Sequence, residues 1–296
     1  MILVTGGLGF VGSNLVDILI NEENDVVVID DLSSESASLD NKNPKATYFI
    51  DKVENINKIL QGYKFDKIFH LAAQARIQPS FERPTEYFNS NALATSELME
   101  FARISKSGIV VYATTSSKNH GSPFITPYTY YKVVGEGILK TYAHCFDINC
   151  AMATFYNVYG PREPKIGEWA TVVAKFGRQY SDGENLTVVG DGSQTRDFTH
   201  VDDICNGLIK ISEGDWRGDN FDLGRGEPVS ILELAKMWVD EDRISFVPLR
   251  KNEGLHTESD WKTTYEKILV DAWKKSENLE MSVYEAKEIC FEHFFE

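Results

Sequence analysis

Short apolar runs alternate with helix-like segments through the first half of the chain. The runs are continuously apolar, as expected of strands covered on both faces of a parallel sheet. Six strands are predicted at Met1–Thr5, Asp25–Asp30, Ala46–Ile50, Lys67–Leu71, Ile109–Ala113 and Asn149–Phe155. Helices are predicted between them at Gly9–Asn21, Val53–Gly62, about Thr85–Ser105 and Thr126–Cys145. This β-α-β-α order predicts an α/β fold with a doubly wound parallel sheet.

The alternation loosens after Tyr156, where prolines and glycines indicate loops. Two short strands are predicted at Asn220–Leu223 and Ile244–Pro248, and a helix is predicted to begin after the cap Ser230 and to run to about Val239. A terminal helix is predicted to open with the capping-box pattern Ser282–Glu285. We find no flexible linker. Residues 1–155 plus 196–222 are therefore predicted to form the sheet domain, and 156–195 plus 223–296 a smaller lobe interleaved with it.

Composition excludes several classes of partner. The chain has 296 residues, 42% of them hydrophobic and 25% charged, which is ordinary for a globular protein. Its net charge of -15 repels phosphate backbones and anionic lipids, so nucleic acid and membrane are poor partners. No apolar run reaches the ~20 residues that span a bilayer, and no leader pattern precedes the first strand. We expect a cytoplasmic protein with reduced cysteines, no disulfide and no bound metal.

A glycine-rich segment, Gly6–Gly12, joins the first predicted strand to the first predicted helix. Gly6 permits a tight turn, Gly9 lets a pyrophosphate approach the backbone, and Gly12 permits close packing of helix on strand. The next strand ends at Asp30, followed by Asp31. A carboxylate at that place binds ribose hydroxyls and repels a 2′-phosphate. The pattern predicts a Rossmann-type site for NAD rather than NADP.

A tyrosine and a lysine share one face of the helix predicted to begin at Thr126. Tyr128 and Lys132 are i, i+4 neighbours. An ammonium lowers the pKa of a nearby phenol, which would make Tyr128 a proton acceptor near neutral pH. Four hydroxyl residues, Thr114–Ser117, follow the preceding strand at the sheet edge where ligands bind. One of these hydroxyls is a candidate to share a substrate hydroxyl with Tyr128; simple capping of the loop is the alternative.

These segments together resemble the extended short-chain dehydrogenase/reductase family, and within it the nucleotide-sugar epimerases and dehydratases of the UDP-glucose 4-epimerase type. The resemblance extends to about Asp260. It also covers the segments His70–Ala73, Asn91 with Thr95, Phe155–Arg162 and Gly190–Asp203. It implies a nucleotide-diphosphate sugar as substrate and a homodimer paired through the helices near 85–105 and 126–145.

The resemblance also implies roles for individual residues. Tyr128 would be the catalytic base and Lys132 its partner, with Thr115 as the third hydroxyl and Ser116 as the alternative. Further cofactor contacts are implied for Phe10, Val11, Leu32, Asp51, Leu71, Ala72 and Ala73.

The implied substrate contacts lie mostly in the second half of the chain. Asn157 and Arg196 would bind the diphosphate. Arg250 resembles a second phosphate-binding arginine, with a plain surface charge as the alternative. Gln74 and Arg76 resemble the uronate 4-epimerases, in which a sugar carboxylate would bind Arg76; a solvent-facing Arg76 is the alternative.

Departures from the family pattern narrow the chemistry. Lys118–Gly121 replaces the usual Val-Tyr-Gly, and Tyr131 replaces a serine or threonine before Lys132. Dehydratases carry an Asp-Glu pair directly after the catalytic threonine, and decarboxylases a glutamate near position 117. Ser116 and Ser117 stand there instead. Neither hydroxyl can replace a carboxylic acid, so dehydration and decarboxylation are disfavoured.

The leading hypothesis is C4 epimerisation of a UDP-hexose, UDP-N-acetylhexosamine or UDP-uronate through a transient 4-keto sugar. The alternatives within the enzymes are a 4-ketoreductase or dehydrogenase and, less favoured, a dehydratase or decarboxylase. An alternative of another class is a protein that senses NAD or a nucleotide-sugar without turnover.

Overall fold

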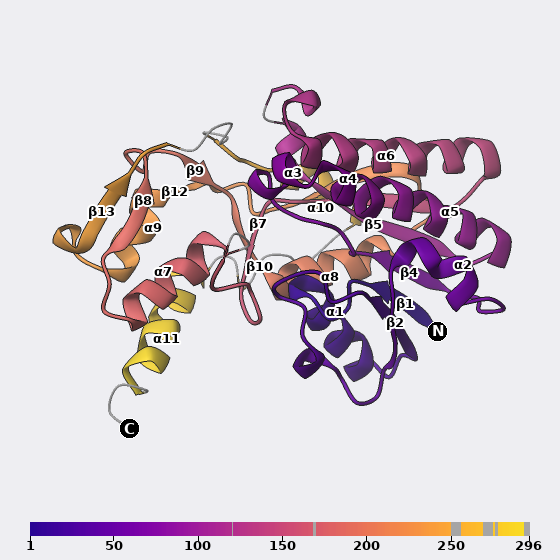
Figure 1. Ribbon diagram of the computed structural model, residues 1–296, viewed down its shortest axis with the longest axis horizontal. Helices are drawn as coiled ribbons and strands as arrows, with labels where there is room; N and C mark the ends of the chain where they lie inside the picture. The colour runs from indigo at the N-terminus through magenta and orange to yellow at the C-terminus, as the bar shows by residue number, and fades with distance from the viewer. Residues whose placement is uncertain (120, 168–169, 250–255, 269–274, 276–277, 293–296) are drawn as a thin grey trace.

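A seven-stranded parallel sheet organises the chain (Figure 1) in a computed structural model that describes residues 1–119, 121–167, 170–249, 256–268, 275 and 278–292. The strand order is β11-β6-β5-β4-β1-β2-β3, and every neighbouring pair is parallel. The strands are β1 Ile2–Thr5, β2 Val26–Asp30, β3 Thr47–Ile50, β4 Lys67–His70, β5 Ile109–Thr115, β6 Cys150–Phe155 and β11 Arg217–Leu223. The predicted Rossmann-type fold class is confirmed, and the order reverses at β1.

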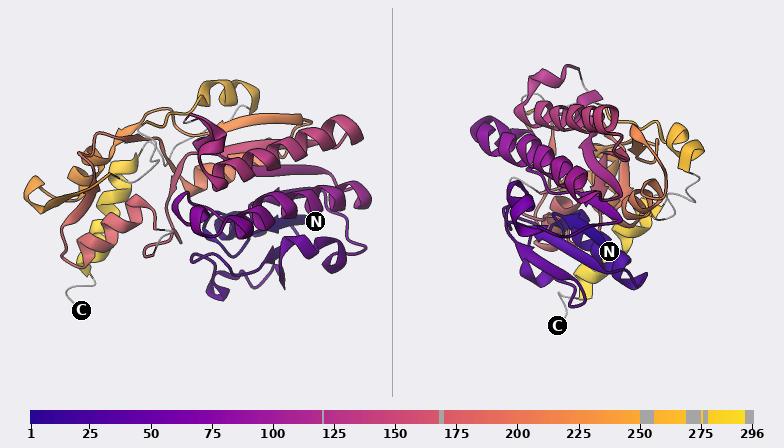
Figure 2. Two further views of the ribbon diagram at one scale, coloured as in Figure 1. Left: turned by 45° about the horizontal axis from the view of Figure 1, so that its top comes forward. Right: turned by 90° about the vertical axis from the view of Figure 1, so that its right-hand side faces the viewer.

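Helices cover both faces of the sheet (Figures 1 and 2). One face packs against α1 Phe10–Asn21 and α8 Val201–Ile211. The other packs against α2 Ile56–Ile59, α5 Ala94–Ser105 and α6 Pro127–Phe146. Every residue of β1, β2 and β5 is buried, which explains why these strands are continuously apolar.

A smaller lobe lies at the carboxyl ends of the strands, on the left of Figure 1. Phe176, Leu234 and Trp238 belong to its own hydrophobic core. The lobe and its junction contain three strand pairs: β7 Asn157–Tyr159 with β10 Phe198–His200, β9 Thr195–Arg196 with β12 Val229–Ser230, and β8 Leu186–Val189 with β13 Ile244–Val247. Its helices are α7 Val172–Ser181, α9 Ile231–Trp238 and α11 Leu279–Glu292.

Like α8, a later helix of the second half packs against the sheet domain and not against the smaller lobe. In α10, Trp261–Ile268, the hydroxyl of Thr264 accepts a hydrogen bond from the backbone N–H of Asp222 on β11 at 2.8 Å. Trp261 and Ile268 pack against the hydrophobic core on the sheet face that α1 and α8 cover. The division into residues 1–155 plus 196–222 and 156–195 plus 223–296 stays a prediction.

Two predicted helix starts are confirmed by their caps. The hydroxyl of Thr126 accepts a hydrogen bond from the N–H of Thr129 at 3.0 Å, and Pro127 is the first residue of α6. Ser230 and Glu233 form a complete capping box at the start of α9. The third cap is wrong: α11 begins at Leu279, so Ser282 lies inside the helix. The helix begins before Ser282, so the capping-box pattern there does not mark the start of the helix.

Two other predicted helices differ in their regularity. Val53–Gly62 contains only a 3-10 turn, Val53–Asn55, followed by the single turn of α2. The helix predicted at Thr85–Ser105 is instead α4 Pro84–Phe88, a π-helical turn Asn89–Leu93, and α5; the short α3, Gln78–Glu82, precedes it. In the described part of the chain no helix is long and apolar enough to cross a membrane.

Candidate functional site

A cleft of about 540 Å³ runs along the carboxyl ends of the sheet strands and is closed on its other side by the smaller lobe. The loops after β1, β2, β3, β4 and β5 all contribute lining residues. The lobe contributes Thr171 and Val172 at the start of α7, and Thr187 and Val189 of β8. Ligands of open α/β sheets bind at this edge, beside the point where the strand order reverses.

The glycine loop after β1 is constrained by its own backbone. Gly6 has a φ of +73°, and a Cβ there would lie 2.8 Å from the backbone nitrogen of Ala72. A Cβ on Gly12 would lie 2.1 Å from the carbonyl oxygen of Gly6, so only glycine lets α1 approach the turn. A Cβ on Gly9 would meet nothing closer than 3.4 Å. Phe10 and Val11 line the cleft at the start of α1, together with Gly6, Gly9 and Gly12.

Asp30 ends β2 inside the cleft and is held rigidly. Its Oδ2 accepts the N–H of Leu8 at 2.9 Å, and its Oδ1 accepts the N–H of Leu32 at 2.8 Å. Burial raises the pKa of this carboxyl, and the two backbone hydrogen bonds oppose the rise. Asp31 also lines the cleft. Leu32 does not: its backbone, with a φ of +57°, serves Asp30 instead.

Residues that follow β3 and β4 line the cleft next to Asp30. Asp51 follows β3 and lines the cleft with Glu54. A hydrogen bond from the side-chain amide of Asn55 lowers the pKa of Asp51. Leu71, Ala72 and Ala73 follow β4 and also line the cleft. The structure therefore brings together all the predicted cofactor residues except Leu32.

The segment after Ala73 is fixed by the π-helical turn. Asn91, which is buried in that turn, accepts the N–H of Gln74 at 2.8 Å and donates to the carbonyl oxygen of Gln74 at 2.9 Å. The extra residue of a π turn often serves a site in this way. The side chain of Gln74 donates to Ser33 Oγ and is not among the residues that line the cleft, so its substrate contact stays a prediction. Arg76, with a φ of +82°, does line it.

Thr115, Ser116, Tyr128 and Lys132 meet at the ends of β5 and α6, where all four line the cleft. Burial raises the pKa of Tyr128, whereas a hydrogen bond with Thr115 and the charge of Arg76 lower it. Thr115 also accepts the N–H of Ser117 at 3.2 Å. Of the two candidate hydroxyls, Thr115 is therefore the one that contacts the phenol.

The ammonium of Lys132 hydrogen-bonds to β5, and its predicted action on Tyr128 stays a prediction. Its Nζ donates to the carbonyl oxygen of Ala113 at 2.8 Å and lies 4.7 Å from the centre of the Tyr112 ring. Burial lowers the pKa of Lys132 to about 7, although the charge of Glu136 raises it. The cation that lowers the pKa of Tyr128 is Arg76. The i, i+4 spacing places both groups on one face, but packing aims the ammonium at β5.

The far end of the cleft is cationic. Asn157 on β7 and Arg196 on β9 line it as predicted. The guanidinium of Arg196 donates to the carbonyl oxygen of Thr195 at 2.8 Å. Lys175 on α7 lines this end as well. Arg250 lies outside the described residues.

Charge is divided along the cleft. Among the described lining residues, the acids are Asp30, Asp31, Asp51 and Glu54, all beside β2 and β3. The corresponding bases are Arg76, Lys132, Lys175 and Arg196, all beyond β4. The acidic end suits uncharged ribose hydroxyls, and the basic end suits a diphosphate.

The model of the NAD dependent epimerase/dehydratase family matches residues 2–224. The chain belongs to this family. A UDP-glucose 4-epimerase of Mycolicibacterium smegmatis is 34% identical over 249 residues, which cover 78% of this chain and 79% of that protein. UDP-glucuronic acid decarboxylase 6 of Arabidopsis thaliana is 31% identical over 270 residues, or 79% of this chain and 72% of the plant enzyme.

A solved structure extends this likeness over the whole chain. The crystal structure of a UDP-glucose 4-epimerase from Thermotoga maritima, with UDP-glucose, matches with a TM-score of 0.89 at 28% identity. The match covers 100% of this chain and 99% of that one. The family of this chain is one of NAD-dependent enzymes, and its relatives include both epimerases and decarboxylases.

Sequence patterns missed the part of this epimerase/dehydratase site that α7 supplies. The helix begins with Val172 and Val173 and contains Gly177, and both residue types have low helix propensity. The available signal was Thr171, whose hydroxyl caps the helix by accepting the N–H of Ala174 at 3.3 Å. Lys175 therefore enters the cleft from a helix that periodicity alone does not reveal.

Proposed function

We propose that this enzyme epimerises C4 of a nucleotide-sugar, with a UDP-hexose as the favoured substrate, while NAD stays bound. The observation that carries the proposal is the local chemistry around Tyr128. Thr115, Ser116, Ser117, Tyr128 and Lys132 line the cleft together, and every carboxylate among its described lining residues lies at the other end. This set can move a proton at a sugar hydroxyl but offers no acid to expel a second group.

The residues present fit NAD. The turn at Gly6 and the close approach of Gly12 leave the start of α1 open to a pyrophosphate. The buried carboxylate of Asp30 suits ribose hydroxyls and would repel a 2′-phosphate. Gly6, Gly9, Phe10, Val11, Gly12, Asp30, Asp31, Asp51, Leu71, Ala72 and Ala73 would hold the dinucleotide. When bound, NAD would accept the hydride from C4 and return it.

The side chains around Tyr128 supply the proton transfer. Tyr128 would take the proton of the 4-hydroxyl, and Thr115, which already hydrogen-bonds with the phenol, would hydrogen-bond with the same substrate hydroxyl. Arg76 favours the phenolate by its charge. Lys132, with a pKa lowered to about 7 by burial, would supply a second cation. The 4-keto sugar would then turn over in the cleft, so that the hydride would return to the other face of C4 and Tyr128 would return the proton to the 4-oxygen.

Epimerisation is favoured over the other reactions of the family because serines, and not carboxylic acids, follow Thr115. Loss of the 6-hydroxyl or of a carboxylate requires a further acid or base near the sugar. Ser116 and Ser117 occupy that wall of the cleft. A net reduction or oxidation would instead require the cofactor to leave after each turnover.

The choice between a neutral sugar and a uronate depends on Arg76. Its charge lowers the pKa of Tyr128 and also that of Glu163, which burial raises to about 7. The charge of Arg76 thus already acts on a carboxyl of the protein. A sugar carboxylate would compete with Glu163 for Arg76, and this favours the neutral hexose. The uronate is the second candidate because Arg76 lines the cleft.

The test is incubation of the NAD-loaded enzyme with UDP-glucose, UDP-N-acetylglucosamine and UDP-glucuronate, followed by proton NMR of the anomeric region. We expect the C4 epimer of UDP-glucose to accumulate to equilibrium without net change in NADH absorbance. Steady consumption of added NADH with a ketosugar would identify a reductase. If all three sugars stay unchanged, the proposed substrate class is wrong.

We also propose a homodimer through α5 and α6. Phe88, Leu93 and Tyr130 are large apolar or aromatic side chains that stay exposed on α4 to α6. Light scattering after size exclusion tests this proposal, and a monomer at every concentration would contradict it.

A further inference from the structure

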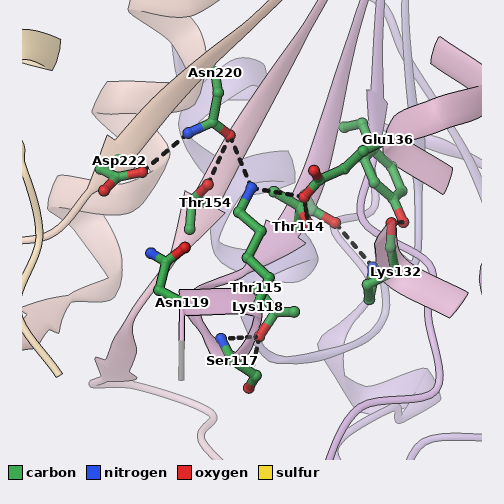
Figure 3. Close-up of polar contacts among 12 residues, drawn as sticks. Thr114, Thr115, Ser117, Lys118, Asn119, Lys132, Glu136, Thr154, Asn220 and Asp222 are labelled. Atoms are coloured by element: carbon green, nitrogen blue, oxygen red, sulfur yellow. Dashed lines mark hydrogen bonds and ion pairs between the residues drawn. The ribbon is translucent and has the colours of Figure 1, made fainter. Parts of the chain in front are cut away.

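The loop that departs from the family pattern places a charged side chain behind the reacting groups. Lys118 extends away from the cleft toward α6 and β11 (Figure 3). Its Nζ donates to Glu136 Oε1 at 2.7 Å and to Asn220 Oδ1 at 3.3 Å. The side chains of Lys118 and Glu136 are only 17% and 9% exposed. A pair this buried is weakly screened by solvent, so its charges act on their neighbours.

Glu136 connects this pair to the reacting residues. It lies one turn after Lys132 on α6, and its charge raises the pKa of Lys132 against the effect of burial. The same oxygen that accepts Lys118 also accepts the hydroxyl of Thr114 at 2.5 Å. Thr114 directly precedes Thr115, the residue that contacts Tyr128. One carboxylate on α6 therefore contacts both β5 and the loop.

The next loop residue makes a second attachment. Asn119 donates to the hydroxyl of Tyr156 at 3.4 Å, and that hydroxyl donates to Asp222 at 2.6 Å. Asn220 joins the two branches, since it accepts from Lys118 and donates to Asp222 at 3.0 Å. The loop that carries Thr115–Ser117 is thus attached from behind to α6 and to the sheet edge (Figure 3).

We propose that Lys118 and Glu136 are positioning residues that hold the hydroxyl loop and, by their opposite charges, set how firmly Lys132 keeps its proton. The proposal rests on the proposed function, because it assumes that Lys132 acts beside the reacting tyrosine. It assigns a use to a lysine that lies outside the cleft and that the family pattern does not predict.

The other groups that face Lys132 carry no charge near neutral pH. His70, from β4, has its pKa lowered to about 3 by burial. Tyr112, from β5, has its pKa raised well above 10 by burial. Tyr128 shares the α6 face, and its pKa is also raised by burial. Among these neighbours, Glu136 is therefore the charged group that changes the pKa of Lys132. Lys118 modifies this effect because it pairs with Glu136.

Two single variants separate this proposal from a purely structural role, because they should shift the pKa of Lys132 in opposite directions. Glu136→Gln keeps an oxygen for Thr114 and Lys118 but removes the negative charge, so the pKa of Lys132 should fall by about one unit. Lys118→Met keeps the side-chain length but removes the positive charge, so that pKa should rise by about one unit. The double variant, Lys118→Met with Glu136→Gln, should return it close to the parent value.

The readout is the 13Cε and 15Nζ NMR titration of Lys132 in the full chain without cofactor, with the signal assigned by its loss in Lys132→Met. If one single variant fails to fold, the other still gives a shift of predicted sign, and Lys118→Arg, which keeps the charge, should keep the parent titration. Equal titration in all variants, or shifts of the same sign in both singles, would overturn the proposal.

Kinetics provide the second readout. In the NAD-loaded enzyme, the alkaline limb of the kcat profile should move with the Lys132 titration, with KM changed less than threefold. If no nucleotide-sugar is turned over but the NMR shifts appear, the proposed function fails and the charge pairing stands. If turnover occurs and the limb does not move with the NMR shifts, the positioning proposal fails alone.

Discussion

The two ends of the cleft differ in charge although one sheet builds both. Beside β2 and β3, Asp30, Asp31, Asp51 and Glu54 face the cleft, while beyond β4 it is lined by Arg76, Lys132, Lys175 and Arg196. The net charge of -15 belongs to the whole chain and does not reveal that the two ends of the cleft differ in charge. The acidic end excludes phosphate, and the basic end attracts it. The division agrees with the proposal that a dinucleotide's adenosine binds at one end and a sugar nucleotide's diphosphate at the other.

The ends also differ in how they are built. The acidic end consists of side chains at or shortly after the ends of β2 and β3. Backbone hydrogen bonds from Leu8 and Leu32 hold Asp30 there. The basic end combines residues from β9, α6, α7 and the loop after β4. The first end is set by local geometry. The second depends on the docking of the smaller lobe, and substitutions should affect the two ends differently.

The largest effect is expected from Tyr128→Phe. Removal of the proton acceptor should lower kcat by about 10²–10⁴-fold, while the affinities for NAD and nucleotide-sugar change little. Tyr130→Phe, on the same helix but exposed, is the matched control and should keep full activity. Stopped assays by NMR measure turnover, and calorimetry measures binding. Turnover equal to that of the parent would remove Tyr128 from the reaction.

Arg196→Met tests the basic end. Loss of charge-assisted hydrogen bonds, each ~1.5–3 kcal/mol, should raise the KM for the nucleotide-sugar roughly 10- to 100-fold and reduce its salt dependence. Binding of NAD should be unaffected. Arg178→Met is the control, because Arg178 pairs with Asp182 and Glu184 on the outer side of α7. Equal KM values in the two variants would contradict a role for Arg196 in diphosphate binding.

Asp30→Asn tests the acidic end. The amide cannot accept both backbone N–H groups and carries no charge, so NAD should bind about tenfold more weakly, and the preference for NAD over NADP should shrink. Asp31→Asn, whose amide oxygen can still accept the N–H of Ser33, should have a smaller effect. Fluorescence titration of both cofactors measures the ratio. An unchanged ratio in the Asp30 variant would show that discrimination resides elsewhere.

A separate effect, on stability rather than on turnover or binding, is expected as the pH changes in the absence of cofactor. The pKa of Lys132 is about 7 in the folded chain, compared with 10.5 as its ordinary value. Between these values the unfolded chain binds a proton that the folded chain has released. The free energy of unfolding should therefore rise with pH from about 7 to about 10.5 through this group, and the destabilisation should be fully present below pH 7.

Urea unfolding of the parent and of Lys132→Met over this range measures that slope. The variant should lack the rise, whereas Lys140→Met, which alters an exposed lysine of the same helix, should keep it. Parallel curves for the parent and Lys132→Met would show that Lys132 titrates normally in the folded chain.

Patterns in the sequence predicted the elements whose causes are local. Continuous apolar runs predicted six strands of the sheet, because burial on both faces leaves no polar position. The caps Thr126 and Ser230 were predicted because a cap acts within three residues of itself. Failures occurred where a distant contact decides the outcome. Ser282 lies inside α11, and the helix around Asn91 adopts a π turn that serves Gln74.

The sequence by itself determined the fold class, the glycine turn, the acid at the end of β2, and the shared helix face of Tyr128 and Lys132. These features follow from strand burial, backbone sterics and helical spacing over a few residues. Only the tertiary structure decided that β11 extends the sheet beside β6, that Lys132 donates to Ala113, and that Lys175 enters the cleft. It also buried Lys118 against Glu136, 18 residues apart. Such contacts depend on which surfaces meet after the chain has folded.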